Sequence, residues 1–187
     1  MHHSYSDYLA LEEEISIRHE YLDGEIYALA GGTPDHAALS LSVLALVRAQ
    51  LPQGCRAFTS NLRVRIPATG LATYPDGAVV CGGTQRADDD RIAVTNPVLL
   101  IEVTSNSSED YDRGEKLRHY QAIPTLREVL ILSHREPRIT LHRRGDDGRW
   151  TTLSAGAGQS VALASTGQQL LVDEIYRDGL EDVTTAR

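Results

Sequence analysis

The sequence IEVTSNSSEDYDRGEKLRHYQ, residues 101–121, predicts the end of a buried strand, a polar turn and a helix. Its first three residues complete the run VLLIEV, residues 98–103, and so apolar a run is expected in a central strand that is covered on both faces. The serines that begin at Ser107 are suitable helix caps, and the helix is expected to continue to about Ala122 and to stop before Pro124. This strand and helix are therefore expected to form the centre of the fold.

Two charged side chains distinguish this segment from its surroundings. Glu102 interrupts the apolar run, and burying a carboxylate costs free energy unless it is paired or binds a metal. Lys116 is the only lysine in a chain with 18 Lys and Arg side chains. An ammonium is a compact point charge whose pKa shifts readily on desolvation, whereas a guanidinium stays charged. Chemistry that requires a lysine would therefore be found here.

Around this segment the sequence predicts alternating helices and strands. Short strands with turn residues between them, together with amphipathic helices, are typical of a sheet on which helices pack. We therefore predict one α/β (α+β) domain over residues 1–187, with a mixed central sheet flanked by helices. The predicted elements are a helix over 5–14, a hairpin turning at Asp23 and Gly24, a helix capped by Thr33 and reaching Gln50, strands over 56–66, 74–82, 97–105, 127–133 and 138–144, short β pieces over 149–165 and a helical turn over 172–180.

Composition limits the classes of function. The net charge of −8 and the pI of about 5.3 argue against a broad basic surface for nucleic acid, although a local basic groove remains compatible with them. No apolar run approaches the roughly 20 residues that span a bilayer, and the polar, acidic N-terminus does not resemble a secretory signal. Cys55 and Cys81 lack a C-x-x-C spacing, so we expect two reduced thiols in a cytoplasmic protein.

A third residue completes a candidate site. Asp76 begins a predicted strand, so its carboxylate could meet that of Glu102 at one end of the sheet and hold a hard divalent cation. Lys116, on the following helix, could direct its ammonium to the same point. Simpler interpretations exist for each residue: a Pro-Asp-Gly turn for Asp76, an arginine ion pair or a solvent-facing edge for Glu102, and a surface pair with Asp112 for Lys116.

These residues carry a resemblance to the PD-(D/E)xK nuclease superfamily. The lysine of that motif stands two residues after the second acid, where this chain has Thr104. However, EVTSNSSEDYDRGEKLRHYQAIPTLREVLIL is similar to the Uma-two family of restriction-endonuclease-like proteins, in which the lysine is displaced onto the following helix. YPDGAVVCG and EYLDGEIYALAGGTPDHAALS are similar to other characteristic segments of that family, so the resemblance covers approximately residues 5–177.

The resemblance implies a restriction-endonuclease-like fold and a phosphodiesterase site that uses Mg²⁺ or Mn²⁺. Asp76 and Glu102 would be metal ligands, and the carbonyl of Val103 would complete the shell. Lys116 would take the role of the catalytic lysine. Glu20 matches an acidic position in the N-terminal block, where it would lie either at the edge of the site or in a solvated hairpin.

The expected function is that of a metal-dependent endonuclease that hydrolyses phosphodiester bonds of nucleic acid, with DNA as the expected substrate. A homodimer would suit the cutting of both strands, and no membrane association is expected. The alternative is a binding or interaction protein that keeps the nuclease fold and cleaves little. The acidic charge and the lack of an obvious DNA-reading element favour the alternative, whereas the intact set of Asp76, Glu102 and Lys116 favours the nuclease.

Other charged residues carry weaker indications. His36, in the first turn of a predicted helix, could face the site, although a histidine there more often bonds nearby backbone. Arg63 and Arg65, and the arginines at 135, 138, 143 and 144, could contact phosphates or lie on solvated strand faces. Residues 88–90, three aspartates, are predicted to form a solvated turn.

Overall fold

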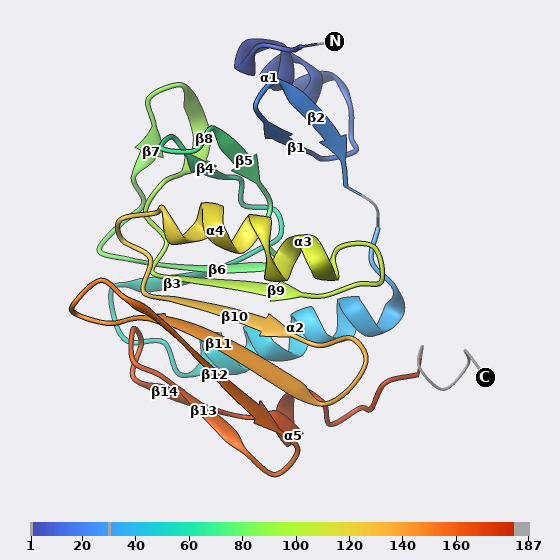
Figure 1. Ribbon diagram of the computed structural model, residues 1–187, viewed down its shortest axis with the longest axis vertical. Helices are drawn as coiled ribbons and strands as arrows, with labels where there is room; N and C mark the ends of the chain where they lie inside the picture. The colour runs from blue at the N-terminus through green and yellow to red at the C-terminus, as the bar shows by residue number, and fades with distance from the viewer. Residues whose placement is uncertain (1, 30, 182–187) are drawn as a thin grey trace.

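The computed structural model describes residues 2–29 and 31–181 and contains one long sheet that we call the main sheet (Figure 1). β9 and β10 run parallel in this sheet, and the other neighbours are antiparallel. Its strands, in spatial order, are β12 (Trp150–Gly156), β11 (Arg138–Arg144), β10 (Glu128–Leu132), β9 (Leu99–Val103), β6 (Gly77–Cys81) and β3 (Cys55–Thr59). The predicted mixed central sheet is confirmed.

A second sheet of short strands was not predicted. Its members have two to five residues. The hairpin predicted at Asp23 and Gly24 and the end of the strand predicted over 56–66 belong to it, but no local pattern indicated that they pair in one sheet. In spatial order they are β2 (Glu25–Ala28), β1 (His19–Leu22), β5 (Leu71–Thr73), β4 (Val64–Ile66), β8 (Asp90–Val94) and β7 (Arg86–Ala87). β13 (Ser160–Leu163) and β14 (Gln168–Leu171) form a separate hairpin.

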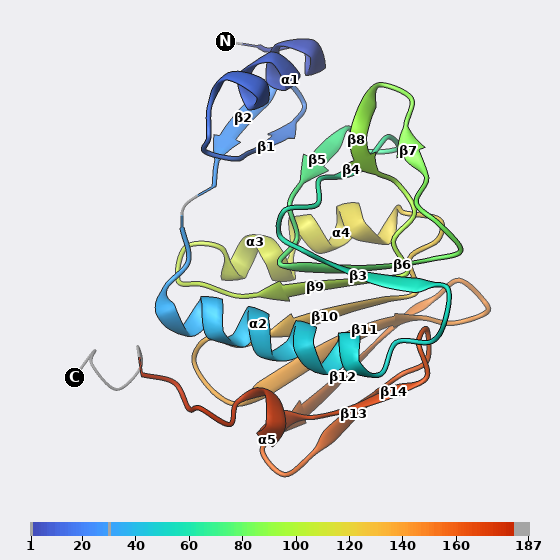
Figure 2. The same cartoon turned by 180° about the vertical axis from the view of Figure 1, so that it is seen from behind.

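Helices cover both faces of the main sheet, as predicted. Figure 2 shows α2 (Pro34–Ala49) along one face with α5 (Val172–Ile175) below it, and Figure 1 shows α3 (Glu109–Arg113) and α4 (Glu115–Gln121) over the other. Residues alternate between the two faces along β9, so Ile101 packs with α2 and Leu100 packs with α4. Glu102 follows the same alternation and faces α4. No helix within the described residues is long and apolar enough to cross a membrane.

Local signals explain where two of these elements begin. The hairpin β1–β2 turns at Asp23 and Gly24, whose φ angles of 48° and 85° suit the tight turn predicted from this dipeptide. Thr33 caps α2 by accepting a hydrogen bond from the backbone N–H of His36, and Pro34 occupies the first helical position. Both predictions are confirmed.

The single helix predicted after Ser107 is divided into α3 and α4. Gly114 separates the two helices with φ −112° and ψ −94°. A Cβ at this position would lie 2.8 Å from the carbonyl oxygen of Asp110, so the close approach of the two turns requires glycine. Because of this break, α4 has its own direction and lies along the main sheet.

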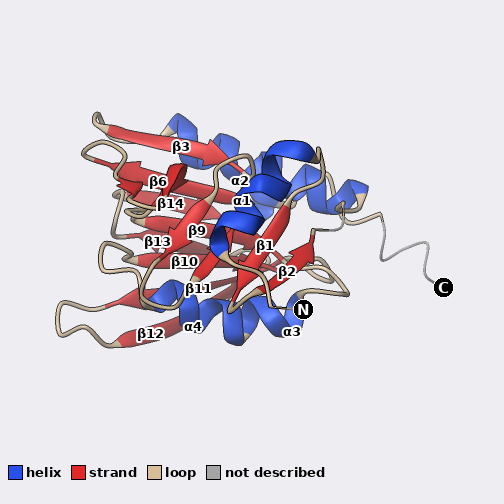
Figure 3. Cartoon of the chain, turned by 90° about the horizontal axis from the view of Figure 1, so that it is seen from above, coloured by secondary structure: helices blue, strands red, loops and turns tan. Residues whose placement is uncertain are grey.

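Residues 2–29 form an N-terminal unit of α1 (Tyr5–Glu14), β1 and β2 that lies over α3 and α4 in Figures 1 and 3. Pairing of Tyr21 with Ala72 joins β1 to β5. Tyr8 and Tyr21 are buried, and their rings lie 5.5 Å apart. These contacts place β1, and with it Glu20, above α4.

The second sheet also corrects the interpretation of the charged strand residues. Arg63 and Arg65 are only 4% and 8% exposed, so the solvated strand face predicted for them is wrong. The guanidinium of Arg63 donates to Asp90 at 3.2 Å, and that of Arg65 donates to Asp89 at 3.1 Å. Asp90 is itself buried, so the solvated turn is wrong at that residue. Pairing of β4 with β8 brings these opposite charges together, and neither arginine lies on an open surface that could receive a phosphate.

The arginines around the β10–β11 hairpin have partners within the protein, and Arg135 and Arg138 remain exposed. The contacts are those of Arg135 with Glu109, Arg138 with Glu136, Arg143 with Glu128, and Arg144 with the carbonyl oxygen of Pro124. A solvated surface therefore describes the first two arginines, whereas the other two hold neighbouring segments together.

The expectation of two free thiols is wrong, because Cys55 and Cys81 form a disulfide. The antiparallel register of β3 and β6 places the two residues directly opposite each other, with their Cα atoms 4.0 Å apart. The two cysteines are 26 residues apart in the sequence, so no local pattern indicated that they pair. Because the cytoplasmic location was inferred from two reduced thiols, the disulfide means that the cysteines no longer support that inference.

Candidate catalytic site

The candidate site lies where β9 ends beneath α4. Glu102 Oε1 lies 3.0 Å from the Lys116 ammonium and also accepts a hydrogen bond from the hydroxyl of Tyr120. Lys116 and Tyr120 are four residues apart and therefore share one face of α4. All three side chains are buried. The helix and the strand thus enclose a charged contact within an apolar layer.

Two further carboxylates surround the same ammonium. Glu20 Oε1, on β1, lies 3.1 Å from Lys116 Nζ and accepts a hydrogen bond from the Thr73 hydroxyl. Asp112 Oδ1, at the end of α3, lies 3.6 Å from Nζ. We call Glu20, Glu102, Asp112 and Lys116 the Lys116 cluster, and each member is 4% or 5% exposed. Three separate elements therefore supply carboxylates to one lysine.

Asp76 approaches this cluster from the neighbouring strand. It immediately precedes β6, and because Gly77 pairs with Ile101 in the antiparallel register, Asp76 lies across from Glu102. Its Oδ2 accepts a hydrogen bond of 2.7 Å from the backbone N–H of Val103. The same oxygen lies 3.3 Å from Nε2 of His36.

The surroundings of these groups shift their proton affinities. Burial, together with the nearby carboxylates Asp112 and Asp76, raises the pKa of Glu102 to about 8. Burial also raises the pKa of Asp112. Burial alone would lower the pKa of Lys116, but the carboxylates led by Glu102 outweigh it and hold this pKa well above its usual value. The lysine is therefore an ammonium at neutral pH.

The chemistry of the donor set fits a cation. Three carboxylates of the Lys116 cluster face one ammonium and Asp76 lies near Glu102, and hard divalent cations prefer such oxygen ligands. The contacts described above use Oδ2 of Asp76 and Oε1 of Glu102, so each residue has a second oxygen to offer. Within residues 2–29 and 31–181, no three side chains of His, Cys, Asp and Glu are grouped as metal ligands. A cation would therefore be held by a pair of carboxylates and backbone oxygen.

The structure brings the predicted site residues together to different degrees. Glu102, Lys116 and Glu20 are in direct contact, and Asp76 lies beside them. The solvated-hairpin interpretation of Glu20 is wrong, because that carboxylate is buried. The pair of Lys116 with Asp112 exists, but it is buried rather than on the surface.

Sequence reasoning did not assign site roles to Asp112, Tyr120 and Thr73. Asp112 and Tyr120 stand four residues before and after Lys116, so helical spacing around the lysine could have identified them. Thr73 belongs to a three-residue strand of the second sheet, and no local pattern connects it with Glu20.

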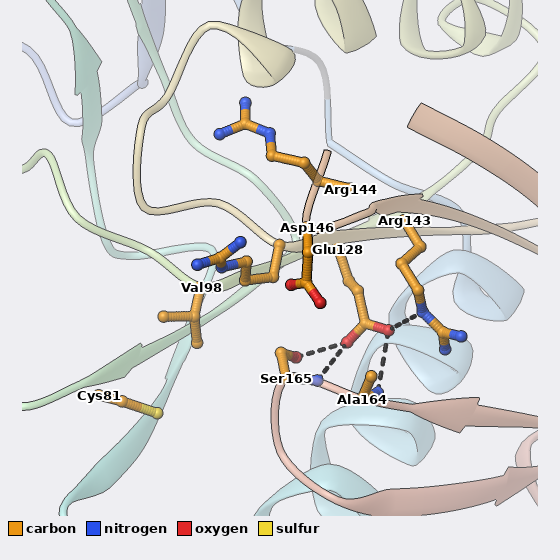
Figure 4. Close-up of a pocket in the computed structure, with 9 residues that line it drawn as sticks. Cys81, Val98, Glu128, Arg143, Arg144, Asp146, Ala164 and Ser165 are labelled. Atoms are coloured by element: carbon orange, nitrogen blue, oxygen red, sulfur yellow. Dashed lines mark hydrogen bonds and ion pairs between the residues drawn. The ribbon is translucent and has the colours of Figure 1, made fainter. Parts of the chain in front are cut away.

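A surface pocket of about 380 Å³ lies away from these residues (Figure 4). Its wall includes Glu128, which pairs with Leu99 at the start of β9, whereas Glu102 pairs with Ile131 three residues farther along. The carboxylate of Glu128 already accepts hydrogen bonds from Arg143 and from the backbone N–H groups that follow β13. This buried acid therefore ties β10 to the β13–β14 hairpin, and the pocket is not part of the candidate site.

Comparisons of the sequence with known proteins found a matching family model and similar relatives. A family model, Uma2, described as "Putative restriction endonuclease", matches residues 5–173. The uncharacterized protein slr1290 of Synechocystis sp. is 38% identical over 172 residues, which cover 91% of this chain and 90% of that protein. A second uncharacterized protein of the same organism, sll1609, is 30% identical over 146 residues, which cover 78% of this chain and 82% of that protein.

A solved structure is similar to the whole fold. It is a crystal structure described as a "putative nuclease belonging to DUF820" from Anabaena variabilis, with a TM-score of 0.71 over 88% of this chain and 92% of that chain. The two sequences are 18% identical, so the likeness concerns the fold.

Proposed function

This chain belongs to the Uma2 family, and from that premise we propose that it is a divalent-metal-dependent endonuclease that hydrolyses phosphodiester bonds of nucleic acid, with DNA as its substrate. The observation that carries the proposal is the meeting of Glu102, Lys116 and Asp76 at the end of β9. A homodimer is part of the proposal, because a chain with one site cuts one strand at a time.

Asp76, Glu102 and the Val103 carbonyl are the groups that would hold Mg²⁺ or Mn²⁺ in this proposal. Such a cation, when bound, supplies a water of lowered pKa and polarises a phosphoryl oxygen. Asp76, just before β6, and Glu102, near the end of β9, lie at the same edge of the main sheet. This supports the assignment, because the paired strands fix the positions of the two residues relative to each other.

Lys116 has an electrostatic role in this proposal. Its pKa lies well above the usual value, so it has no free electron pair with which to accept a proton from water. An ammonium held by three buried carboxylates is fixed in position, and a fixed positive charge stabilises the negative charge that develops on the phosphate. Glu20 and Asp112 share the ammonium with Oε1 of Glu102, and the second oxygen of Glu102 would act with Asp76.

A cleavage screen tests the function. The full chain would be incubated with Mn²⁺ and, in separate reactions, supercoiled plasmid, linear duplex, single-stranded DNA and RNA, with Lys116→Ala and Asp76→Asn in parallel. We expect duplex DNA to be cut, and we expect Lys116→Ala to lower the rate by about 10²–10³-fold, as for the loss of one preorganised donor. Circular dichroism of each variant controls for unfolding.

Two results would contradict the proposal. One is the absence of cleavage of every substrate by the wild-type chain in Mn²⁺. The other is metal-dependent cleavage by folded Lys116→Ala at the wild-type rate, which would remove the lysine from the mechanism.

The second candidate is a binding protein that retains the nuclease fold. The observation in its favour is the burial of the whole Lys116 cluster, combined with a net charge of −8. Calorimetric titration with Mn²⁺ separates the two candidates. A binding site that is lost in Asp76→Asn supports the enzyme, whereas equal titration curves for both proteins support the binding protein.

A further inference from the structure

His36, which belongs to α2, lies beside Asp76, one of the candidate metal ligands. It lies in the first turn of α2, on the face of the main sheet opposite α4, and its Nε2 is 3.3 Å from Asp76 Oδ2. Its side chain is 20% exposed, so the ring lies at the border between the buried cluster and solvent. The backbone of Val103 also faces this ring.

A backbone N–H and an imidazole nitrogen from different elements therefore meet at one oxygen of Asp76. The Val103 N–H approaches Oδ2 from β9 at 2.7 Å, and His36 approaches it from α2. Both contacts use Oδ2, so Oδ1 is the oxygen that the carboxylate can offer to a further ligand. Groups that hold a metal ligand commonly determine its orientation and its affinity for the ion.

The backbone makes room for the histidine ring. A Cβ at Gly32 would lie 2.6 Å from Nδ1 and 2.9 Å from Cγ of His36, distances that real Cβ atoms do not show. At the neighbouring Gly31, nothing lies within 4 Å of such a Cβ. The absence of a side chain at residue 32 thus allows the ring to lie where it reaches Asp76, and the cap at Thr33 holds the same turn.

We propose that His36 is a positioning residue that holds Asp76 through Oδ2 so that Oδ1 can bind the divalent cation. This inference rests on the proposed function, because it assigns Asp76 to the metal. Gly32 and the Thr33 cap place the imidazole, the imidazole orients the carboxylate, and the carboxylate binds the ion. His36 itself contacts neither the cation nor the nucleic acid in this arrangement.

Mn²⁺ binding to the metal-free full chain tests the inference without any cleavage reaction. The dissociation constant would be measured by calorimetry, or by electron paramagnetic resonance of free Mn²⁺. We expect His36→Ala to raise it by about 10–100-fold, the usual effect of removing a group that holds a metal ligand. His36→Gln should restore most of the affinity, because its amide nitrogen can donate to the same oxygen.

The two glycines supply a matched pair of variants. Gly32→Ala should weaken Mn²⁺ binding in the same direction as His36→Ala, because the new Cβ displaces the ring without removing it. Gly31→Ala should leave the dissociation constant unchanged. Thermal unfolding of each protein shows whether any weakened binding reflects a loss of folded protein.

The outcomes separate this inference from the proposed function. If Asp76→Asn loses Mn²⁺ while His36→Ala binds it as tightly as, or more tightly than, the wild-type chain, the proposed metal site stands and the positioning role is overturned. If the wild-type chain and Asp76→Asn bind Mn²⁺ equally, or neither binds it, the metal site itself fails and the role of His36 fails with it. Weakened binding in His36→Ala and Gly32→Ala, with recovery in His36→Gln, supports the inference.

Discussion

Lys116 is the cation that contacts three buried acidic side chains, so its contribution to folding exceeds that of an ordinary ion pair. An exposed lysine pair contributes little to stability, because water screens both charges. Here the partners Glu20, Glu102 and Asp112 are as buried as the ammonium itself. The same lysine therefore has a structural role as well as the catalytic role that we propose for it.

Replacing Lys116 by Met is expected to destabilise the protein. The substitution keeps an unbranched side chain but leaves buried carboxylates without their cation, which typically costs about 3–5 kcal/mol. Urea unfolding at neutral pH measures the loss. Adding Glu102→Gln to the Met variant should recover part of it. A midpoint equal to that of the wild-type chain would show that the charge of Lys116 does not stabilise the folded state.

Glu102 makes the stability depend on pH. Its pKa is raised from 4.5 in the unfolded chain to about 8 in the folded protein. Between these values the folded state keeps a proton that the unfolded state has lost, so the stabilisation is complete below pH 4.5 and is lost as the pH rises through 8. The metal-free wild-type chain should lose up to about 1.4 kcal/mol of unfolding free energy per pH unit in this window.

Glu102→Gln should flatten this dependence, because an amide has no proton to lose. Asp112, whose pKa is also raised, would retain part of the slope at lower pH. Urea unfolding of the metal-free protein across the window measures the effect, with the exposed Glu14→Gln as the control. Parallel pH profiles for wild type and Glu102→Gln would contradict the assignment.

At the scale of elements, the disulfide joins the edge strand β3 to β6, the strand that Asp76 precedes. It connects Cys81, at the far end of β6 from Asp76, with Cys55. The bond therefore holds the edge of the main sheet without contacting the candidate site. Its effect should appear in stability rather than in metal binding.

Reducing the disulfide is expected to lower the unfolding free energy by about 2–4 kcal/mol, because the unfolded chain regains the freedom of a closed loop. Urea unfolding with and without dithiothreitol measures this change. The double variant Cys55→Ser/Cys81→Ser is the control and should not respond to the reductant. Equal midpoints for the wild-type chain in both conditions would show that β3 is held by its hydrogen bonds and packing alone.

At the scale of the whole molecule, the N-terminal unit completes the Lys116 cluster. Glu20 belongs to this unit, whereas Glu102, Asp112 and Lys116 belong to the body beneath it (Figure 1). The contact of 3.1 Å between Glu20 and Lys116 thus joins two parts of the molecule. Loss of this contact should therefore weaken the packing of the N-terminal unit on α3 and α4, and displacement of the unit should remove Glu20 from Lys116.

Glu20→Ala is therefore expected to loosen the N-terminal unit. Hydrogen exchange measured by mass spectrometry should become faster in α1, β1 and β2 than in the main sheet, because the unit loses an ion pair with the body. Glu25→Ala, at an exposed position of β2, is the matched control. Equal exchange in the two variants would show that the tyrosine packing and the β1–β5 pairing alone hold the unit.

The sequence by itself determined the local elements and the motif residues. The Asp23-Gly24 turn, the cap at Thr33 and the apolar run around Glu102 each depend on neighbours within a few residues, so short-range physical chemistry was sufficient to predict them. Charged residues in or beside apolar strands and the single lysine singled out Asp76, Glu102 and Lys116, and the resemblance to a known family then implied their roles.

Only the tertiary structure decided which distant groups meet. The pairing of Cys55 with Cys81, the burial of Arg63 against Asp90 and the approach of His36 to Asp76 all depend on strand register and on how the elements pack. Local sequence patterns do not predict contacts between residues that are far apart in the chain. Their free energies arise from desolvation and charge at short range, which exist only after the sheets have formed.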